Sequence, residues 1–357
     1  MDTSDMATWL LYGAYGYTGR LIGEEAQRRG LRIIAAGRDA EQLAEVQTAW
    51  SVPGRVVSLQ DETALRDVLD EVDGVMHCAG PFEDTARPMA NACLDTGTHY
   101  LDITGEWRVF EALRRRDAEA RDAGIVVLPG VGFDVVPTDC VAATLAQACP
   151  DAVALSLGFV GLGALSRGTA LTALRGWGQG SLMRRNGELV RIPAGTHTRE
   201  VDIAGRTRTL TAIPWGDVST AYHSTGISTI AVYTHLPPAL RWMLRASGSL
   251  PAWLRAVLRP VAEGVVRRTV DGPDAEMRKT GASWVWGQVQ GSDGSTRTAR
   301  WTGPEGYTLT ARTAVEAMHR MSDAPPEPGY HTPSTAFGAQ FVSAVSGSST
   351  VQLEPAP

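Results

Sequence analysis

Three glycines, each three residues from the next, stand between an apolar run and a helical run near the start of the sequence. Gly13, Gly16 and Gly19 lie in LYGAYGYTGR, between a strand predicted over residues 9–12 and a helix predicted over residues 17–29. A glycine turn of this kind brings unpaired backbone N–H groups and the positive end of the helix dipole to one place, which favours a phosphate group. The spacing GxxGxxG is looser than GxGxxG, so a glycine turn without a ligand remains the alternative until its surroundings are considered.

A basic residue follows the strand predicted over residues 31–36, at the position whose side chain commonly distinguishes NAD from NADP. In an NAD site this position usually carries Asp or Glu, which accepts hydrogen bonds from the ribose 2′-hydroxyl. The chain has Arg38 there, in AAGRD, and a guanidinium group suits a 2′-phosphate. Asp39 is predicted to cap the helix that follows. The alternative is that Arg38 is a solvated surface charge, but its position favours NADP(H) as the cofactor.

Polar and reactive side chains also lie at the ends of the strands predicted over residues 74–78 and 99–103. Small residues in HCAGPF would let the backbone pass close to the ribose and nicotinamide of a dinucleotide. We interpret Cys78 as a buried filler rather than a nucleophile, because no activating base is evident, and His77 as a packed side chain. Asp102, Thr104 and Glu106, in LDITGEW, either bind substrate and transfer protons or serve the start of a helix.

A nicotinamide cofactor transfers a hydride. This reaction also needs a protein group that supplies a proton or an electrostatic partner to the substrate. Asp134, in GVGFDVVP, is the best candidate, because it follows the sixth predicted strand on the cofactor side. The other candidates are Glu106, Asp139, Tyr222 and His223. Thr138 and Asp139 have an alternative use as caps of the helix that follows them.

Alternating strand and helix signals position these side chains. Strands are predicted over residues 9–12, 31–36, 56–59, 74–78, 99–103 and 125–128, and helices over residues 17–29, 40–49, 63–69, 87–94 and 106–123. Six strands joined by crossover helices specify an α/β fold with a Rossmann-type, doubly wound parallel sheet. The glycines lie in its first strand–helix turn, where a dinucleotide pyrophosphate binds.

From Asp151 the apolar pattern changes to the alternation of half-buried strands. Strands are predicted over residues 153–159, 207–213, 227–235, 284–290, 296–301 and 307–310, and helices over residues 171–185 and 238–268. Residues 291–295 are typical of a hairpin connection. We therefore predict an inserted α+β domain with a mostly antiparallel sheet.

The stretch from Leu236 to Arg268 has the most unusual local composition, because tryptophan and aliphatic residues alternate with six arginines. Basic amphipathic helices with tryptophan can lie on anionic membranes or cover an acyl chain. The alternative, which we favour, is a pair of short helices that pack on their own domain or on a second copy. We therefore expect a homodimer, and membrane contact is not favoured.

Composition excludes several classes of protein. With 357 residues the chain is long enough for two domains, and its 43% hydrophobic and 20% charged residues are typical of a soluble globular protein. A net charge of −6 argues against nucleic acid as a partner. The four cysteines show no metal-ligand spacing, so we predict no metal. No signal peptide and no membrane-length apolar run are found, so we expect a cytoplasmic protein.

Five segments, in this order and spacing, resemble those of a known family. LYGAYGYTGR, AAGRD, HCAGPF, GTHYLDITGE and GVGFDVVPTD are similar to segments of the saccharopine dehydrogenase-like oxidoreductases, which include saccharopine reductases and the trans-acting enoyl reductases of bacterial lipid synthesis. The later segments IPWGDVSTAYHSTGI, GPEGYTLTA and TPSTAFG resemble the shorter bacterial members. The resemblance implies a Rossmann domain that binds NADP(H), an inserted α+β domain with substrate contacts and the dimer interface, and a C-terminal segment that returns to the first domain.

These domains are expected over residues 1–134, 135–328 and 329–357, with a frayed tail from about Ser346. The predicted cofactor-binding residues are Gly13, Tyr15, Gly16, Tyr17, Thr18, Gly19, Arg38, Cys78, Ala79, Gly80, Pro81, Phe82, Asp102, Gly132, Phe133 and Asp134, and the predicted catalytic residues are Asp134, Glu106 and Tyr222.

The predicted function is NADP(H)-dependent hydride transfer to or from a C=N or C=C bond of a small-molecule or acyl-type substrate. Saccharopine itself is not the expected substrate, because the several basic residues that its two amino-acid moieties require have no evident place in the sequence. Two alternatives remain open: an NADP-binding sensor or scaffold without turnover, and an enoyl reductase acting on a lipid-like or carrier-bound substrate.

Overall fold

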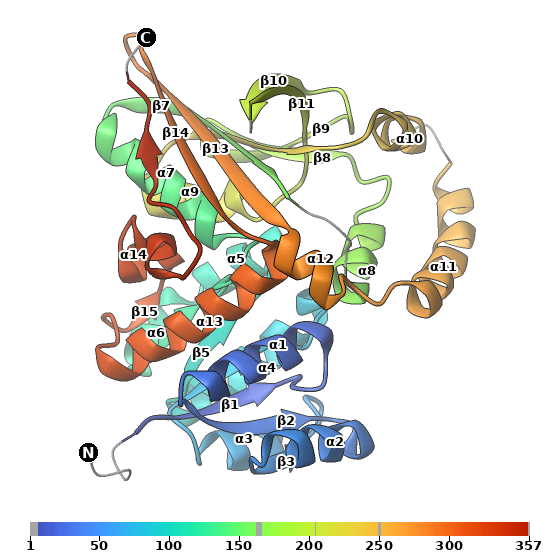
Figure 1. Cartoon of the computed structure of the whole chain (residues 1–357), viewed down its shortest axis with the longest axis vertical. Coiled ribbons are helices and arrows are strands. Elements are labelled where there is room, and N and C mark those ends of the chain that lie inside the picture. Colours follow the sequence, from blue (N-terminus) through green and yellow to red (C-terminus); the bar gives the residue numbers. More distant parts are fainter. Residues whose placement is uncertain (1–5, 162–165, 204, 249–250, 356–357) are drawn as a thin grey trace. The chain divides into compact units, whose positions relative to one another are not determined.

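The computed structural model describes residues 6–161, 166–203, 205–248 and 251–355 (Figure 1). The chain divides into two compact units, the first formed by Met1–Val136 and Tyr307–Phe341, the second by Pro137–Gly306 and Val342–Pro357. The predicted domain ranges differ from this division in three places: they assign residues 135–136 and 307–328 to the second domain, and residues 342–357 to the segment returning to the first. Within the described ranges, no helix is both long enough and apolar enough to cross a membrane.

The first unit is built on a parallel sheet of seven strands in the order β15-β6-β5-β4-β1-β2-β3. Its strands are β1 (Thr8–Tyr12), β2 (Arg32–Gly37), β3 (Gly54–Val56), β4 (Gly74–His77), β5 (His99–Asp102), β6 (Val126–Leu128) and β15 (Gly329–Tyr330). β2 and β3 lie on one side of β1 and β4 to β6 on the other, so the strand order reverses between β1 and β4. Doubly wound sheets bind nucleotides at such a reversal, and the predicted sheet is confirmed.

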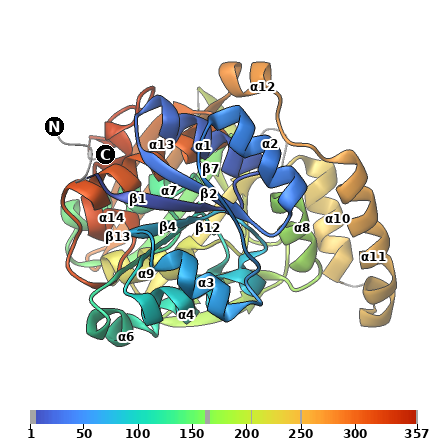
Figure 2. The same cartoon turned by 90° about the horizontal axis from the view of Figure 1, so that it is seen from below.

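Helices cover both faces of this sheet, with α1, α2 and α13 on one face and α3 and α4 on the other (Figure 2). The helices of this unit are α1 (Tyr17–Arg28), α2 (Ala40–Trp50), α3 (Glu62–Leu69), α4 (Phe82–Thr96), α5 (Trp107–Arg114), α6 (Asp117–Asp122), α13 (Gly306–Asp323) and α14 (Pro333–Phe337). Leu10 and Val75 of the strands share a buried core with Leu65 and Met89 of α3 and α4. Because both faces are buried, the strands are continuous apolar runs rather than alternating ones.

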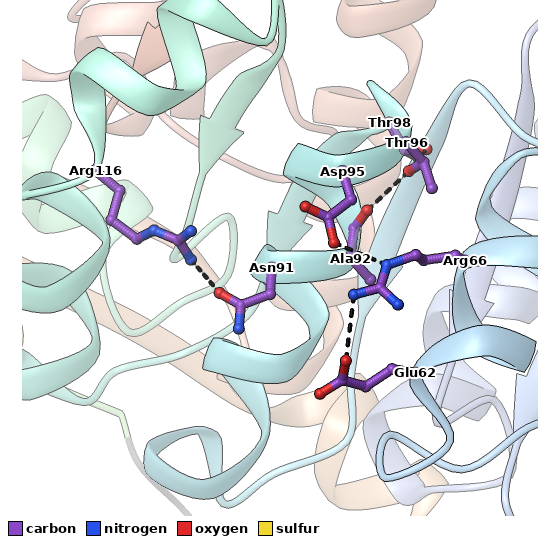
Figure 3. A network of polar contacts seen from close by, with 8 residues as sticks. All are labelled: Glu62, Arg66, Asn91, Ala92, Asp95, Thr96, Thr98 and Arg116. Carbon is purple, nitrogen blue, oxygen red and sulfur yellow. Dashed lines mark hydrogen bonds and ion pairs between the residues drawn. The ribbon is translucent and has the colours of Figure 1, made fainter.

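A polar network joins α3 and α4 on the outside of their layer (Figure 3). Arg66 of α3 pairs with Asp95 of α4 at 2.8 Å and with Glu62 of its own helix at 3.2 Å. Asn91 of α4 accepts a hydrogen bond from Arg116 at 2.6 Å. Since these ion pairs are exposed, each contributes about 0–1 kcal/mol, and the network orients the helices more than it stabilises them.

The second unit is built on a mixed sheet of nine strands, with the path β10-β11-β12-β7-β13-β14-β16 and the hairpin β8–β9 attached to β12. Its strands are β7 (Ala152–Val160), β8 (Ser181–Arg185), β9 (Glu188–Ile192), β10 (Thr198–Ile203), β11 (Arg206–Ala212), β12 (Thr229–His235), β13 (Ala282–Gly291), β14 (Thr296–Pro304) and β16 (Gln352–Leu353). Among the pairings described, only β12 with β7 is parallel, so the predicted mostly antiparallel sheet is confirmed.

Six helices of the second unit lie in the described part of the chain. They are α7 (Val136–Ala148), α8 (Arg167–Arg175), α9 (Asp217–Thr225), α10 (Pro238–Gly248), α11 (Ala252–Thr269) and α12 (Ala275–Thr280), and a short 3₁₀ helix spans Phe341–Ala344. α7 packs on the middle of the sheet at Gly287, where a Cβ would lie only 2.5 Å from the side chain of Val141. The absence of a side chain at Gly287 therefore lets α7 approach β13.

Two predicted elements of the middle region are wrong. Residues 307–310 form the first turn of α13 rather than a strand, because the apolar alternation there is too short to separate the two periods. Residues 171–185 are not one helix: α8 ends at Arg175 and residues 181–185 form β8. Gly178 and Gly180 lie between them with φ of +75° and +83°, values that a helix does not tolerate.

The C-terminal tail is paired with the sheet, and the predicted fraying from about Ser346 is wrong for residues 349–354. The backbone N–H of Ser349 donates to the carbonyl oxygen of Thr302 at 2.8 Å, and β16 pairs with β14 in antiparallel register. Val351 is buried. Polar composition alone predicted fraying, but a short edge strand needs only a few ladder hydrogen bonds to be held.

Candidate functional site

The turn between β1 and α1 requires glycine at two positions. Gly13 has φ of +85°, and a Cβ there would lie 2.9 Å from the backbone nitrogen of Ala79, just beyond β4. At Gly19 a Cβ would lie 2.2 Å from the carbonyl oxygen of Gly13, so the first turn of α1 packs directly on the strand end. Tight turning and close helix–strand packing are the uses that this glycine pattern has in dinucleotide sites.

The N-terminus of α1 has no side-chain cap. Gly16 is the N-cap residue and offers no side-chain acceptor. The first N–H groups of a helix have no intrahelical partner, and the aligned peptide dipoles place partial positive charge there. Tyr17 and Thr18, in this first turn, are half-buried. This helix start can therefore bind a phosphate group.

Tyr15 connects the glycine turn to the end of β2. Its hydroxyl oxygen accepts hydrogen bonds from the backbone N–H groups of Arg38 and Asp39, at 3.2 and 3.3 Å. Its ring lies against Gly37, where a Cβ would be 2.3 Å from the nearest ring carbon. Tyr15, which was predicted to bind the cofactor, thus positions the backbone of Arg38 by hydrogen bonding.

Arg38 and Asp39 have different roles at the end of β2. Asp39 caps α2 by accepting a hydrogen bond from the backbone N–H of Gln42 at 3.1 Å, which confirms that prediction. Arg38 is exposed, and within the described ranges its guanidinium group forms no hydrogen bond or ion pair. An exposed guanidinium beside a helix start that suits a phosphate can bind a second phosphate.

Cys78, which is half-buried rather than buried as predicted, and His77, which is fully buried, lie at the end of β4 and have pKa values that disfavour proton transfer near neutrality. Burial, and next the Asp102 carboxylate, raise the pKa of the Cys78 thiol above its ordinary value, so the thiolate needed by a nucleophile is disfavoured. His77 is fully buried, and burial lowers its pKa to about 3, so its ring is neutral. Its Nε2 lies 3.1 Å from the hydroxyl of Thr85. The interpretation of His77 as a packed side chain is confirmed.

Residues 79–82 lead from β4 into α4. The Thr85 hydroxyl lies 2.7 Å from the carbonyl oxygen of Ala79 and 3.1 Å from that of Pro81, so α4 fixes the loop that carries Gly80. Phe82 begins α4, and its ring meets His77 edge to face. The small side chains of this loop leave its backbone close to the glycine turn, as the contact between Gly13 and Ala79 shows.

Glu106 caps α4, a helix that begins 24 residues before it. Its two carboxylate oxygens accept hydrogen bonds from the backbone N–H groups of Phe82 and Glu83, at 3.0 and 2.7 Å. The N-cap residue of α4, Pro81, has no side-chain acceptor of its own. A carboxylate at this end also interacts favourably with the helix dipole. The side chain of Glu106 therefore caps α4, while its backbone forms the N-cap of α5, which follows it.

Asp102 ties the end of β5 to the loop after β6. One carboxylate oxygen accepts hydrogen bonds from the backbone N–H groups of Thr104 and Gly130, both at 2.9 Å. The other accepts from the hydroxyl of Tyr100 at 2.5 Å. Burial nevertheless raises the pKa of Asp102 to about 6. Its carboxylate, predicted to bind the cofactor, is thus directed at groups of the protein itself.

The loop after β6 is held by two threonines of α13 that the sequence pattern did not indicate. Thr310 accepts a hydrogen bond from the backbone N–H of Phe133 at 3.0 Å, and Thr313 donates to the carbonyl oxygen of Val131 at 2.7 Å. A Cβ at Gly132 would lie 2.9 Å from the Thr310 side chain. The helical period of residues 306–323 was the signal that could have placed these threonines on one helix face.

Asp134 is the carboxyl group of the site whose pKa best suits proton transfer. It is half-buried and lies against Gly105, where a Cβ would be 2.6 Å from one of its carboxyl oxygens. Burial, and next the charge of Glu106, raise the pKa of Asp134 to about 7. A carboxyl with this pKa is present in both protonation states near neutrality, as a general acid or base requires.

Tyr222, the third predicted catalytic residue, lies in the second unit on α9. The guanidinium of Arg184 stacks over its ring, 4.2 Å from the centroid. Arg184 is itself buried and donates to the carbonyl oxygen of Val218 at 2.7 Å. Thr138 donates to a carboxylate oxygen of Asp217 at 2.7 Å and so joins the starts of α7 and α9.

The two remaining candidates for proton transfer also belong to the second unit. Asp139 is buried in the first turn of α7, and His223 is exposed on α9. In the described part of the chain, no group of three or more His, Cys, Asp or Glu side chains could hold a metal ion.

The parallel sheet with its reversed strand order, the glycine turn and the uncapped α1 define the first unit as a dinucleotide-binding domain of the Rossmann class. Residues 9–128 match the family model of the saccharopine dehydrogenase NADP-binding domain. The first unit is thus an NADP-binding domain of the saccharopine dehydrogenase type, which confirms the resemblance seen in the motifs and NADP(H) as the cofactor of the matched domain.

Curated relatives each match about a third of the chain. The trans-acting enoyl reductase of Mycobacterium leprae is 33% identical over 140 residues, which cover 36% of this chain and 33% of the relative. The saccharopine dehydrogenase-like oxidoreductase of mouse is 27% identical over 150 residues, which cover 36% of this chain and 35% of the relative. The matched part spans about a third of the length of these relatives.

One solved structure resembles the whole chain. Apo histidine-tagged saccharopine dehydrogenase (L-Glu forming) from Saccharomyces cerevisiae matches with a TM-score of 0.66, over 98% of this chain and 100% of that one. At 15% sequence identity the likeness shows a common fold. The predicted combination of a Rossmann sheet and an α+β domain is therefore that of a saccharopine dehydrogenase.

Proposed function

We propose that the protein is an NADP(H)-dependent oxidoreductase that transfers a hydride to or from a C=N or C=C bond of a small-molecule or acyl-type substrate. The observation that carries the proposal is the uncapped start of α1 beside the exposed Arg38. Together they offer two binding places for phosphate, as the pyrophosphate and 2′-phosphate of NADP require. The cradle at Gly13 and Gly19, which a Cβ would fill, fits the same group.

The protein's own residues would then bind the cofactor and handle a proton. The bound NADP(H) supplies or accepts the hydride at its nicotinamide ring. Asp134, with its pKa near neutrality, is proposed to give or take the accompanying proton. Glu106 is proposed as a positioning residue, because its carboxylate is engaged with α4 and its charge raises the pKa of Asp134.

The names of the relatives support both bonds as acceptors. A trans-acting enoyl reductase is among them, which supports reduction of C=C, and saccharopine dehydrogenases support chemistry at C=N. The competing proposal is an NADP-binding protein without turnover. Steady NADPH consumption with an imine or an enoyl thioester identifies the enzyme and its bond, whereas tight binding without consumption across both panels favours the sensor.

Replacing Arg38 tests the cofactor assignment. Arg38→Ala removes a charge-assisted contact with the 2′-phosphate, so NADPH binding is expected to weaken by about 1.5–3 kcal/mol, while NADH binding stays unchanged. Calorimetric titration of both nucleotides into both proteins measures this. Arg32→Ala is the matched control, because Arg32 is also exposed and lies at the opposite end of β2. Equal affinities of the unmodified protein for NADPH and NADH would refute the assignment.

A further inference from the structure

Helices α10 and α11 turn large apolar side chains toward solvent. Trp242 is 70% exposed and Trp253 is 68% exposed. The other exposed apolar residues of the two helices are Leu240, Met243, Val257, Leu258, Val261 and Val265. On α11 the exposed positions recur every fourth residue from Trp253 to Val265, so they share one helix face. An exposed apolar helix face of this kind marks an interaction site.

Two arginines of the same helices bond to the rest of the second unit. Arg245 donates to the carbonyl oxygen of Gly195 at 2.6 Å, and Arg255 donates to that of Gly178 at 2.5 Å. In both views α11 lies at the outer edge of its unit, beside α8 (Figures 1 and 2). A surface helix usually turns its apolar face to the core and its charged face to solvent. Here arginines bond to the unit and apolar side chains face outward.

A basic pocket lies beside α10. It has a volume of about 340 Å³ and is lined by Arg206 and Arg208 of β11, His235 of β12 and Arg241 of α10, with no acidic side chain in its lining. The Nε atom of Arg208 is buried, and it has no hydrogen-bond partner among the described residues. Several guanidinium groups around one pocket suit a phosphate group.

The charge of this region distinguishes between possible occupants. Residues 236–268 contain six arginines and one acidic residue, Glu263, a net charge of +5, whereas the whole chain carries −6. A twofold dimer through this face would bring it against its own copy, and like charges would oppose each other. An anionic bilayer instead offers opposite charge together with an apolar interior, and Trp and Arg both favour its headgroup region.

We propose that α10, α11 and the basic pocket form a docking surface for an anionic lipid bilayer. The exposed apolar side chains enter the boundary between headgroups and acyl chains, and the pocket binds a lipid phosphate. The binding is peripheral. It differs from the preference that we drew from the sequence, which was packing on the same domain or on a second copy. The exposure of Trp242 and Trp253 shows that their own unit does not cover them, and the net positive charge of residues 236–268 disfavours a second copy.

Vesicle flotation tests the apolar part of this surface. The unmodified protein is expected to float with vesicles of phosphatidylcholine and phosphatidylglycerol, and to remain unbound with phosphatidylcholine alone or at high salt. The double variant Trp242→Ser, Trp253→Ser should partition about tenfold or more weakly. Because both side chains are mostly exposed, its melting temperature should not change. The matched control is Val56→Ser, Val153→Ser, which alters exposed apolar residues elsewhere and should float normally.

Substitution in the pocket tests the headgroup part. Each arginine removed near an anionic surface lowers partitioning about fivefold, so Arg206→Gln with Arg241→Gln should weaken flotation about 25-fold. The control Arg32→Gln should have no effect. Calorimetry with inorganic phosphate separates the sources of the anion: phosphate binding in this pocket without any vesicle binding would make it a site for a free anion and overturn the proposal.

Light scattering without vesicles examines the alternative occupant. A dimer that dissociates in the Trp242→Ser, Trp253→Ser variant, with no flotation of either protein, would assign this face to a second copy and overturn the proposal. Flotation that is equal in the unmodified protein and both double variants would also overturn it.

Discussion

Asp134 and Glu106 are neighbouring carboxyl groups with different environments. Both oxygens of Glu106 accept backbone hydrogen bonds at the start of α4, which stabilises its ionised form. Burial of Asp134, and next the charge of Glu106, raise the pKa of Asp134 to about 7. A carboxyl with a raised pKa beside a second carboxyl is a frequent arrangement in acid–base catalysis, and here the second carboxyl is held by the start of α4.

The raised pKa of Asp134 predicts a dependence of stability on pH. The folded state retains this proton up to about pH 7, whereas the unfolded state releases it near the ordinary pKa of 3.8. Between these values the folded state binds more protons, so its free energy of unfolding falls as pH rises. Asp134→Asn cannot ionise and should lack this fall. The expected difference between about pH 5 and about pH 8 is about 2 kcal/mol, reduced from the full shift because the side chain is partly hydrated.

Urea unfolding of the unmodified protein and Asp134→Asn at the two pH values measures this difference. Asp122→Asn is the control, because Asp122 is exposed at the end of α6. If Asp134→Asn and the unmodified protein lose the same stability on going from low to high pH, the elevated pKa is not a property of Asp134.

At the scale of elements, two glycines at the start of α1 are expected to have different roles, one in folding and the other in ligand binding. A Cβ at Gly19 would lie 2.2 Å from the Gly13 carbonyl oxygen, so Gly19→Ala must displace the helix and should cost about 1–3 kcal/mol. At Gly16 the backbone is extended, and a Cβ would lie 3.2 Å from the same oxygen. Gly16→Val should therefore fold with a small change in melting temperature and lose NADPH binding, because its side chain fills the space that the pyrophosphate would occupy.

Thermal unfolding and NADPH titration of both glycine variants distinguish the two roles. Gly30→Ala is a useful reference for strain alone: Gly30 has φ of +74° but no atom within 4 Å of an added Cβ, and it follows the far end of α1. Normal NADPH affinity in Gly16→Val would show that the cofactor does not approach this turn.

Local patterns predicted the elements that carry the site, but not the contacts between distant segments. The apolar runs at residues 9–12 and 31–36, with glycines between strand and helix, were sufficient to place the turn and Arg38. Glu106 could not be assigned to α4 from the sequence, because the two are 24 residues apart and a carboxylate before α5 fits an ordinary helix start equally well. The strand predicted at residues 307–310 was wrong for a related reason, since four residues do not distinguish the two periods.

At the scale of the whole molecule, the direction in which an amphipathic helix faces is a tertiary property. The sequence of α11 places Trp253, Val257 and Val261 on one face, but the same pattern serves a buried helix and an outward-facing one. The hydrogen bonds of Arg245 and Arg255 to neighbouring loops show which side of α10 and of α11 packs on the second unit. The expected homodimer stays a prediction, and a docking surface on α10 and α11 would require it to form through another face.

The C-terminal residues predict how strongly the second unit depends on the last part of the chain. Val351 is buried, and β16 covers the edge of β14, next to the buried Trp301. Removal of residues 346–357 should therefore destabilise the second unit by about 2–4 kcal/mol, through lost burial and an uncovered strand edge. NADPH affinity should change little, because the residues proposed to bind it belong to the first unit.

Single substitutions distinguish specific packing of this tail from a general effect of shortening the chain. Val351→Ser places a polar side chain in a buried position and should reproduce much of the loss, whereas Leu353→Ser, at an exposed position two residues further on, should be nearly neutral. Urea unfolding followed by tryptophan fluorescence measures all three proteins, since Trp301 lies on β14. A tail that frays in solution would make the truncation and both substitutions equally harmless. The pairing of Ser349 with Thr302 and of β16 with β14 argues that it does not, because each of these contacts would have to break in the folded protein.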